Sequence, residues 1–260
     1  MMGWMGGAQP AKLLRKVCHI EAVRGNVASS EWTRLPVYTL TFANPGGASL
    51  GVRIDCGDVV KVVVPGYKPK SYSMSAERNG EFDITFKVYP GGMCSGYLDS
   101  VRVGEDIQVF RMGRKERQPG SHIGLVAFGV GITEALPIAA AELARRDALH
   151  VKLLWASKTY GDMFWHHEID QLLKEHPERF SVETILSREA REGSRHGRCT
   201  SEVLAAVFDG SWGTSVGGPN AARRDGARFL TVGTKPMMRE AEAMLGRIGY
   251  SVPGKHSLLR

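Results

Sequence analysis

The chain has 260 residues, which is enough for two domains of ordinary size, each with a hydrophobic core of its own. Hydrophobic residues make up 43% of it, and no apolar run approaches the roughly 18 residues that indicate a membrane-spanning helix. The formal net charge is +7, but the lysines and arginines are scattered and lack the clustered stripe of a nucleic-acid groove. We expect no transmembrane segment and no nucleic-acid partner, because small polyphosphate ligands explain the charge equally well.

The spacing of cysteines and histidines indicates no metal site. The cysteines are far apart and form no CxxC pair, so neither a zinc site nor a disulfide framework is expected. They are Cys18, Cys56, Cys94 and Cys199. His166 and His167 are adjacent, and on a helix their side chains point about 100° apart, so they cannot chelate one ion together.

The first residues carry a weak signal of location. Residues 1–20 contain basic side chains and no acidic one, as a mitochondrial address does, although the segment is short and poor in serine. A plain frayed terminus has the same composition. The unpaired cysteines favour a reducing compartment. We therefore expect a cytoplasmic or mitochondrial location.

The first half of the chain has the pattern of a small barrel of antiparallel strands. Short runs rich in Val, Ile, Thr and Tyr alternate with clusters of Gly, Pro and Asn. In residues 81–89 apolar and polar side chains alternate, as in a strand with one face on a core. The predicted strands are residues 16–22, 37–42, 59–64, 81–89 and 106–111.

The second half changes to strands that alternate with helices, which implies right-handed crossovers and a parallel sheet. The predicted strands are residues 123–128, 151–156, 180–186 and 228–232, and the predicted helices are residues 134–146, 163–175, 200–208 and 236–248. The boundary is expected near residues 118–121, giving a barrel domain over 1–120 and an α/β domain over 121–260. Residues 209–226, rich in Gly, Ser and Ala, are expected to form a surface loop.

Two glycine turns are expected at the carboxyl ends of parallel strands, where open α/β sheets bind ligands. Residues 129–133 (Gly-Val-Gly-Ile-Thr) follow the first of these strands and open a helix, so a pyrophosphate could approach the backbone N–H groups. Residues 233–237 (Gly-Thr-Lys-Pro-Met) repeat this after the last strand, with Pro236 suited to a first helical turn. Ordinary strand-to-helix turns and helix caps contain the same residues, so each motif alone leaves both interpretations open.

The barrel half contains two further motifs. Residues 91–95 (Gly-Gly-Met-Cys-Ser) precede a short helical piece and suit a phosphate, although a β-hairpin with a serine N-cap has the same sequence. Residues 70–73 (Lys-Ser-Tyr-Ser) place Lys70 and Tyr72 on one side of a strand and Ser73 on the other. A flavin needs a charge for its phosphates, a surface for its ring and a hydrogen bond near its reactive nitrogen. A plain edge strand would contain similar residues.

A basic cluster follows the third strand of the second half. Its members are Ser187, Arg188, Arg191, Arg195 and Arg198. Guanidinium groups bind phosphates bidentately, so a 2′-phosphate at this sheet edge would indicate NADPH rather than NADH. A solvated basic loop is the other interpretation.

In this order, the motifs resemble those of the ferredoxin–NADP reductase superfamily, and most closely its NADH–cytochrome b5 reductase-like branch, from about residue 15 to residue 250. That family has a flavin-binding barrel followed by a nicotinamide-binding α/β domain. Its Arg-x-Tyr-Ser/Thr motif is similar to residues 70–73, which implies that Lys70 lies near the pyrophosphate, Tyr72 against the isoalloxazine and Ser73 near flavin N5.

The resemblance implies the other cofactor-binding residues as well. In the barrel half they are Lys87, Val88 and Tyr89, on a strand whose backbone lines the flavin, and Gly92, Met93, Cys94 and Ser95, on the FAD pyrophosphate. In the second half they are Gly129, Gly131, Thr133, Gly233, Pro236 and Met237 for the nicotinamide nucleotide, and Ser187 and Arg188 for a 2′-phosphate. Ser73, near N5, and Thr133, which would position the nicotinamide, are the catalytic candidates.

Some residues depart from the family pattern. Lys70 replaces an arginine, and Val232 replaces a cysteine that lies near the nicotinamide in many members. Phe128, Val130 and Glu134 replace Gly, Thr and Pro in the nicotinamide turn, and residues 255–260 lack the family's aromatic ending. These departures support an alternative, in which the chain is a catalytically weakened or inactive reductase-like subunit that acts as a structural or interaction module.

The resemblance predicts a flavoprotein oxidoreductase. It would pass a hydride from NADPH or NADH to FAD, and then single electrons to an acceptor such as a cytochrome b5-type haem protein. An iron–sulfur protein or a quinone also accepts single electrons, and a place in a larger assembly stays open. FAD rather than FMN follows from the resemblance alone.

Overall fold

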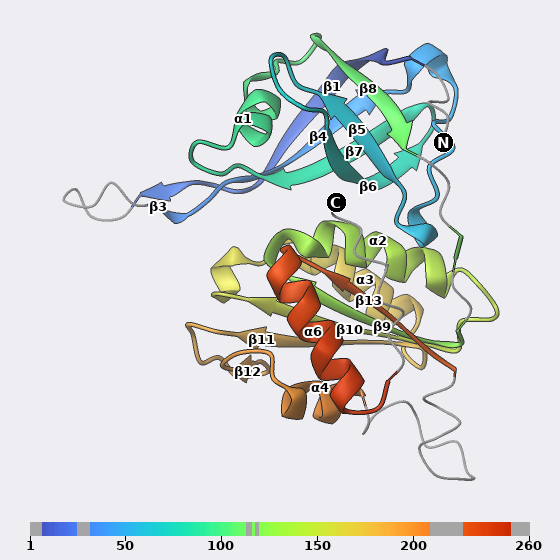
Figure 1. The fold of residues 1–260 in the computed structure, drawn as a ribbon, viewed down its shortest axis with the longest axis vertical. Coiled ribbons are helices and arrows are strands. Elements are labelled where there is room, and N and C mark those ends of the chain that lie inside the picture. The colour runs from blue at the N-terminus through green and yellow to red at the C-terminus, as the bar shows by residue number, and fades with distance from the viewer. Residues whose placement is uncertain (1–6, 25–31, 113–115, 118–119, 209–225, 251–260) are drawn as a thin grey trace. The chain divides into compact units, whose positions relative to one another are not determined.

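The computed structural model describes residues 7–24, 32–112, 116–117, 120–208 and 226–250. Parts of several predictions therefore fall outside the described residues: positions 1–6 of the basic segment 1–20, positions 118–119 of the boundary 118–121, positions 209–225 of the loop 209–226, and the tail 255–260. The chain divides into two compact units, Met1–Glu116 and Arg117–Arg260. Figure 1 shows a barrel in the first unit and a sheet with helices in the second, as predicted.

Unit 1 is a closed antiparallel barrel of six strands. Their order around the barrel is β1 (Gln9–Ile20), β4 (Val37–Ala43), β7 (Glu81–Lys87), β6 (Lys70–Arg78), β5 (Val59–Val63) and β8 (Asp106–Met112). A separate two-stranded sheet pairs β2 (Val23–Arg24) with β3 (Trp32–Arg34). The unit also contains helix α1 (Met93–Ser100) and the short 3-10 turns η1 (Pro45–Gly47) and η2 (Ile54–Cys56).

Strand β1 is longer than the predicted strand 16–22, because it pairs with two neighbours. Its first residues, from Gln9 to Lys12, pair with β8, and the segment from Leu13 to Ile20 pairs with β4. The partner changes between Lys12 and Leu13, and a register shift between Leu13 and Arg15 follows directly. A strand that turns from one side of a barrel to the other does not keep one alternating pattern, so only its second part was predicted.

Strand β7 is buried on both faces, whereas the alternation in residues 81–89 predicted one face on a core. Asp83 and Thr85, on the polar face, are 7% and 4% exposed. Each has partners there, because Arg78 donates to Asp83 at 2.8 Å and the Thr85 hydroxyl lies 2.9 Å from that of Ser75. Neighbouring polar side chains thus cover this face, which a pattern of apolar residues does not indicate.

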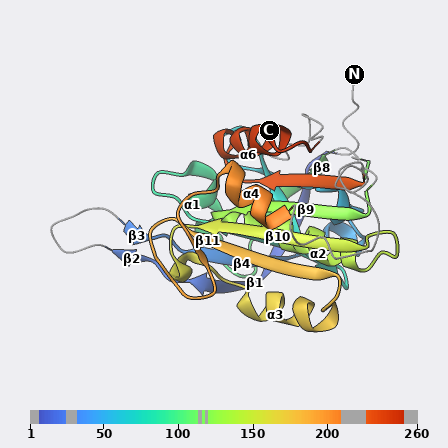
Figure 2. The same cartoon turned by 90° about the horizontal axis from the view of Figure 1, so that it is seen from below.

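Unit 2 is a five-stranded parallel sheet. Its order is β12 (Arg195–His196), β11 (Phe180–Leu186), β10 (His150–Ser157), β9 (His122–Phe128) and β13 (Ala227–Val232). The helices are α2 (Ile132–Leu143), α3 (His166–Glu175), α4 (Ser201–Phe208) and α6 (Lys235–Arg247), with 3-10 turns η3 (Gly129–Gly131) and η4 (Tyr160–Asp162). Helix α2 packs on β9, β10 and β13, while α4 and α6 share one core with the sheet. In Figure 2, α6 lies beyond β13 and α3 lies beyond β11.

Three elements of unit 2 differ clearly from their predictions. Helix α2 spans Ile132–Leu143 rather than residues 134–146. Helix α3 begins at His166 rather than near residue 163, because Trp165 has a left-handed φ of 61°, which interrupts a continuous helix. The short strand β12 was not predicted, since a two-residue strand has no periodicity. None of the helices in the described ranges is long and apolar enough to cross a membrane.

A buried ion cluster joins the start of unit 2 to helix α2. Glu142, with a fully buried side chain, accepts hydrogen bonds from Arg117 at 2.8 and 3.0 Å and also from Arg228. Arg117 additionally reaches Asp147 at 3.1 Å. These contacts fix the position of α2 against β13, which carries Arg228.

Candidate functional site

The turn between β7 and α1 closes on itself. The Tyr89 N–H donates to Ser95 Oγ at 3.2 Å, and the Ser95 hydroxyl donates to the Gly92 carbonyl at 3.2 Å. The Gly92 N–H donates to the Tyr89 carbonyl at 2.9 Å. A Cβ atom on Gly92 would lie 2.5 Å from Ser95 Oγ and 3.0 Å from the Tyr89 carbonyl oxygen, so only glycine fits there.

The first turn of α1 is suited to an anion. Its N-cap is Gly92, and no side chain caps the helix, so the N–H groups of the first turn are not held by a capping side chain. Ser95, which the sequence allowed as an N-cap, lies inside the helix instead and holds the turn. Met93 is 60% exposed, while Cys94 and Ser95 are buried. We call the turn of residues 89–95 the α1 cradle. The N–H groups at this helix start suit the pyrophosphate of a dinucleotide.

The β6 motif places one aromatic ring beside α1. Tyr72 is half-buried, and its ring meets Phe86 edge-on with the centroids 6.1 Å apart. Burial raises the pKa of the Tyr72 hydroxyl, and the neighbouring Cys94 of α1 raises it further, so this hydroxyl stays protonated at neutral pH. Lys70 is exposed and Ser73 is half-buried, opposite Val59 of β5. The flavin contacts of Lys70, Tyr72 and Ser73 stay predictions.

The predicted strand through Lys87, Val88 and Tyr89 ends earlier than expected. Strand β7 stops at Lys87, and the next two residues are irregular. The Val88 N–H donates to the Pro36 carbonyl at 3.0 Å, and Tyr89 forms the turn toward α1. These hydrogen bonds replace the ladder of a regular strand.

Replacing Gly92 with alanine should disrupt the α1 cradle. The added Cβ atom would collide with Ser95 Oγ, which forces the turn open, and we expect flavin affinity to fall about tenfold or more, as a lost charge-assisted hydrogen bond would cause. Gly96, in the same helix, is the matched control, because a Cβ atom there meets nothing within 4 Å. Fluorescence titration with FAD measures both variants. Equal affinities for Gly92→Ala and Gly96→Ala would contradict this role for the turn.

The two predicted glycine turns of unit 2 interlock at the carboxyl edge of the sheet. Strands β9 and β13 are adjacent and parallel, with Val232 opposite Ala127. A Cβ atom on Gly131 would lie 2.5 Å from the Val232 carbonyl oxygen. Conversely, a Cβ atom on Gly233 would lie 3.0 Å from the ring and Cβ of Phe128. Close packing therefore requires glycine at both positions. Phe128 and Val232, two residues that depart from the family pattern, lie against these glycines.

Trp155 supports the first of these turns, a role that the sequence did not indicate. Its side chain is completely buried on β10, and its indole N–H donates to the Gly129 carbonyl at 2.9 Å. Gly129 itself has a left-handed φ of 55°, and a Cβ atom there would meet nothing within 4 Å. In the sequence, Trp155 lies in an apolar strand, where a tryptophan is usually a core residue.

Two helices begin at these turns without side-chain caps. Thr133 and Glu134 lie in the first turn of α2 and are buried, with 8% and 4% of their surfaces exposed. Helix α6 begins after Thr234, with Pro236 in its first turn and Met237 46% exposed. Two helix starts at adjacent strand ends fit the phosphates of a nucleotide. The nucleotide contacts of Gly129, Gly131, Thr133, Gly233, Pro236 and Met237 remain predictions.

The basic cluster lies where β10 and β11 end. The Ser187 N–H donates to the Ser157 carbonyl at 3.0 Å, and the Arg188 N–H donates to the Lys158 carbonyl at 2.9 Å. Both side chains are exposed. Among the described residues, the Arg188 guanidinium forms no ion pair, whereas Arg195 pairs with Glu183 at 2.7 Å.

A stack of side chains borders this cluster. The Arg191 guanidinium lies 3.7 Å from the centre of the Tyr160 ring, which stacks on His166 at 4.7 Å. The Tyr160 N–H donates to Glu189 at 2.8 Å. Arg191 and His166 are therefore engaged by packing, and the described residues contain no cluster of three potential metal ligands.

Models of known protein families match both units of the chain. Residues 36–111 match the model of the oxidoreductase FAD-binding domain, and residues 125–243 match that of the oxidoreductase NAD-binding domain. NADH-cytochrome b5 reductase 1 of Scheffersomyces stipitis is 30% identical over 211 residues, which cover 77% of this chain and 69% of that protein. The chain belongs to the NADH-cytochrome b5 reductase family. FAD and NADH or NADPH are therefore its cofactors, as predicted.

A second relative and two solved structures are also similar to this chain. NADH-cytochrome b5 reductase 1 of Mycosarcoma maydis is 29% identical over 226 residues, covering 85% of this chain, which spans only 64% of that protein. The cytochrome b5 reductase domain of Ulva prolifera nitrate reductase has the same fold, with a TM-score of 0.70 at 20% identity and 96% of each chain covered. An H286L mutant of Plasmodium falciparum ferredoxin-NADP+ reductase also shares the fold, with a TM-score of 0.65 at 15% identity, covering 92% of this chain and 91% of that one.

Proposed function

We propose that this member of the family is a flavoprotein reductase that takes a hydride from NADH or NADPH onto FAD and passes single electrons to an acceptor protein. One observation carries the proposal. In each unit, a helix without a side-chain cap begins after a glycine, which is Gly92 in unit 1 and Gly131 in unit 2. A Cβ atom on either glycine would lie 2.5 Å from a neighbouring oxygen. These two helix starts support one dinucleotide site in the barrel and another on the sheet.

The flavin would supply the chemistry that converts two-electron into one-electron transfer. The protein residues supply binding and orientation. In unit 1, Lys70 and the start of α1 would hold phosphates, the half-buried Tyr72 ring would support the isoalloxazine, and the Ser73 hydroxyl would donate near N5. In unit 2, the Gly131 turn and Thr133 would position the nicotinamide.

We propose a haem protein as the acceptor, because the relatives are named cytochrome b5 reductases. The first test is the absorbance spectrum of the purified protein, with extraction of its flavin and anaerobic titration with NADH and NADPH. A yellow protein that NAD(P)H bleaches, and that then reduces a cytochrome b5-type protein, is the expected result. A colourless protein that binds neither FAD nor FMN would instead support the non-catalytic module.

The exposed Arg188 supports binding of NADPH as well as NADH. Its guanidinium forms no ion pair with the described residues, and it follows Ser187, a hydroxyl donor, at the sheet edge. Such a pair suits a 2′-phosphate. Replacing Arg188 with alanine should raise the Kd for NADPH about tenfold or more, because a charge-assisted hydrogen bond is lost, and leave that for NADH unchanged.

Arg195→Ala is the matched control for Arg188→Ala. Arg195 lies in the same cluster but already pairs with Glu183, so its loss should change neither Kd by more than about twofold. Titration of both nucleotides against each variant separates the two residues. An equal loss of NADH and NADPH affinity in Arg188→Ala would contradict a 2′-phosphate contact.

A further inference from the structure

A row of side-chain hydrogen bonds crosses four neighbouring strands of the barrel. The His19 Nε2 atom lies 2.7 Å from the Thr39 hydroxyl, which in turn lies 2.7 Å from the Thr85 hydroxyl. The Thr85 hydroxyl lies 2.9 Å from that of Ser75. These residues belong to β1, β4, β7 and β6, which are adjacent in this order around the barrel. We call the four side chains the hydroxyl chain.

The hydroxyl chain is shielded from solvent along its length. Thr85 is 4% exposed, and His19, Thr39 and Ser75 are half-buried. Buried hydroxyl groups need hydrogen-bond partners, and these groups have one another. Each hydroxyl has a single proton to donate, so the direction of the hydrogen bond at one end decides the direction at the next.

The register of the strands brings Ser73 beside Thr85. Met74 of β6 pairs with Ile84 of β7, so the next position on each strand sets Ser73 opposite Thr85. One position further, the aromatic rings of the two strands are 6.1 Å apart, as this register requires. Thr85 therefore connects the hydroxyl chain to the residue that we expect near flavin N5.

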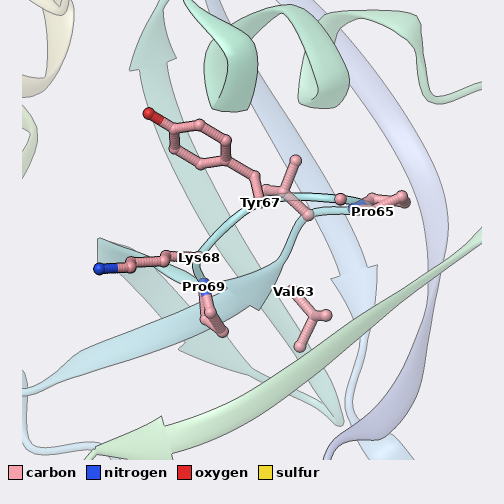
Figure 3. Close-up of a pocket in the computed structure, with 7 residues that line it drawn as sticks. Val63, Pro65, Tyr67, Lys68 and Pro69 are labelled. Atoms are coloured by element: carbon pink, nitrogen blue, oxygen red, sulfur yellow. The ribbon is translucent and has the colours of Figure 1, made fainter.

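The turn from β5 holds the other side of β6. The Tyr67 N–H donates to the Val64 carbonyl at 3.0 Å, and Figure 3 shows Tyr67 extending from this turn. In the strands that the turn joins, Val59 of β5 pairs with Ser73. Ser73 thus lies between β5 and β7, with Thr85 as its neighbour on the β7 side.

His19 sets the direction of the hydroxyl chain. A neutral imidazole accepts at Nε2 in one tautomer and donates there in the other, and a protonated imidazole donates. When His19 accepts, Thr39 donates to it and Thr85 donates to Thr39, so Ser73 can donate to Thr85. When His19 donates, both threonines donate toward β6, and Ser73 keeps its proton for another partner.

The flavin changes its hydrogen bonding in a matching way. Oxidised N5 has a lone pair and accepts, whereas N5 of the reduced flavin carries the transferred hydrogen and donates. We propose that the hydroxyl chain links the redox state of the flavin to the proton on His19 Nε2, with Thr39 and Thr85 as positioning residues for Ser73. The inference rests on the proposed function.

The two states differ in the direction of every hydrogen bond along the hydroxyl chain. In the oxidised protein His19 donates from Nε2, and Ser73 donates to N5. In the reduced protein N5 donates to Ser73, Ser73 to Thr85, Thr85 to Thr39 and Thr39 to His19. The hydroxyls only rotate, and the proton that leaves Nε2 passes to water, which can return one to Nδ1.

The charged and titratable groups around His19 come from each element packed near it. They are Arg15, Lys16, Cys18 and Glu21 beside it, Tyr38 on β4, Glu81, Asp83 and Lys87 on β7, Arg78 on β6 and Asp99 on α1. Rotation of the hydroxyls leaves these groups where they are. They therefore affect the proton on His19 in both redox states, whereas the hydroxyl chain produces the difference between the states.

Histidine NMR of the holoprotein tests the link. With isotope-labelled histidine, long-range proton–nitrogen correlation spectra report which ring nitrogen carries a proton, and His19→Gln identifies the signal of His19. Spectra are recorded at one near-neutral pH before and after reduction with dithionite. Nε2 of His19 should carry a proton in the oxidised protein and lose it on reduction. His122 and His150, which belong to unit 2, should not change.

Thr85→Val breaks the hydroxyl chain while keeping the shape of the side chain, so the redox-dependent change at His19 should disappear. Thr39→Val breaks the same chain one strand away and should have the same effect. Thr85→Ser keeps the hydroxyl and should restore the change. Thr41→Val is the matched control, because Thr41 is also a buried threonine of this barrel, 3% exposed, outside the hydroxyl chain.

The outcomes separate this inference from the proposed function. A His19 signal that reduction leaves unchanged in the wild type would overturn the link while the flavin reductase stands. A change that survives in Thr85→Val or Thr39→Val would do the same. If the wild type binds no flavin, the proposed function fails and the inference fails with it.

Discussion

Replacing Glu142 with alanine should lower the free energy of unfolding by about 3–5 kcal/mol, as expected when one partner of a buried ion cluster is removed. Glu142 is fully buried between Arg117 and Arg228, whose side chains are only 10% and 7% exposed. Without the carboxylate, two buried guanidinium groups lose their shared partner. Urea denaturation followed by circular dichroism and tryptophan fluorescence measures the change.

Glu183→Ala is the matched control for this prediction. Glu183 also pairs with an arginine, Arg195, at 2.7 Å, but the two side chains are 31% and 39% exposed. An exposed pair contributes at most about 1 kcal/mol, so this variant should be nearly as stable as the wild type. A similar loss in both variants would mean that burial does not set the strength of the Glu142 cluster.

Replacing Gly131 with alanine should slow flavin reduction by NAD(P)H about 100-fold, since displacement of a positioning turn by about 1 Å has effects of this size. The backbone of Gly131 is helical, with φ −58°, so alanine suits its dihedral angles, and the damage is steric. The new Cβ atom would lie 2.5 Å from the Val232 carbonyl oxygen, and backbone cannot move aside as a flexible side chain can. Anaerobic stopped-flow mixing with NADPH measures the rate.

The flavin content distinguishes this effect from general misfolding. Gly131→Ala should retain its FAD, because the proposed FAD site belongs to unit 1. Gly246→Ala is the control, since a Cβ atom on this helical glycine meets nothing within 4 Å. It should reduce its flavin at the wild-type rate. A normal rate in Gly131→Ala would show that the interlocked turns do not position the nucleotide.

The sequence predicted the arrangement of the fold well, because its periodicities are local properties. Strand β11 has the predicted bounds, strands β4, β5, β8, β9 and β13 differ from theirs by one residue at one end, and β10 differs by one residue at each end. Two of the errors lie where two partners or an unusual dihedral angle decide the structure. Strand β1 changes neighbours along its length, and the left-handed Trp165 delays the start of α3.

The candidate site was predicted less completely. Gly92, Gly131 and Gly233 could be named because short glycine motifs precede helices. Their physical reason became visible only in space, where Gly131 meets Val232 and Gly233 meets Phe128.

By itself, the sequence determined the order of a barrel and an α/β unit, the family resemblance and the glycine turns, because these depend on neighbouring residues along the chain. The tertiary structure alone decided how the turns are supported. Trp155 reaches Gly129 across 26 positions, and Arg228 reaches Glu142 across 86. Hydrogen bonds between such distant residues form only after the strands have paired, so no local pattern records them.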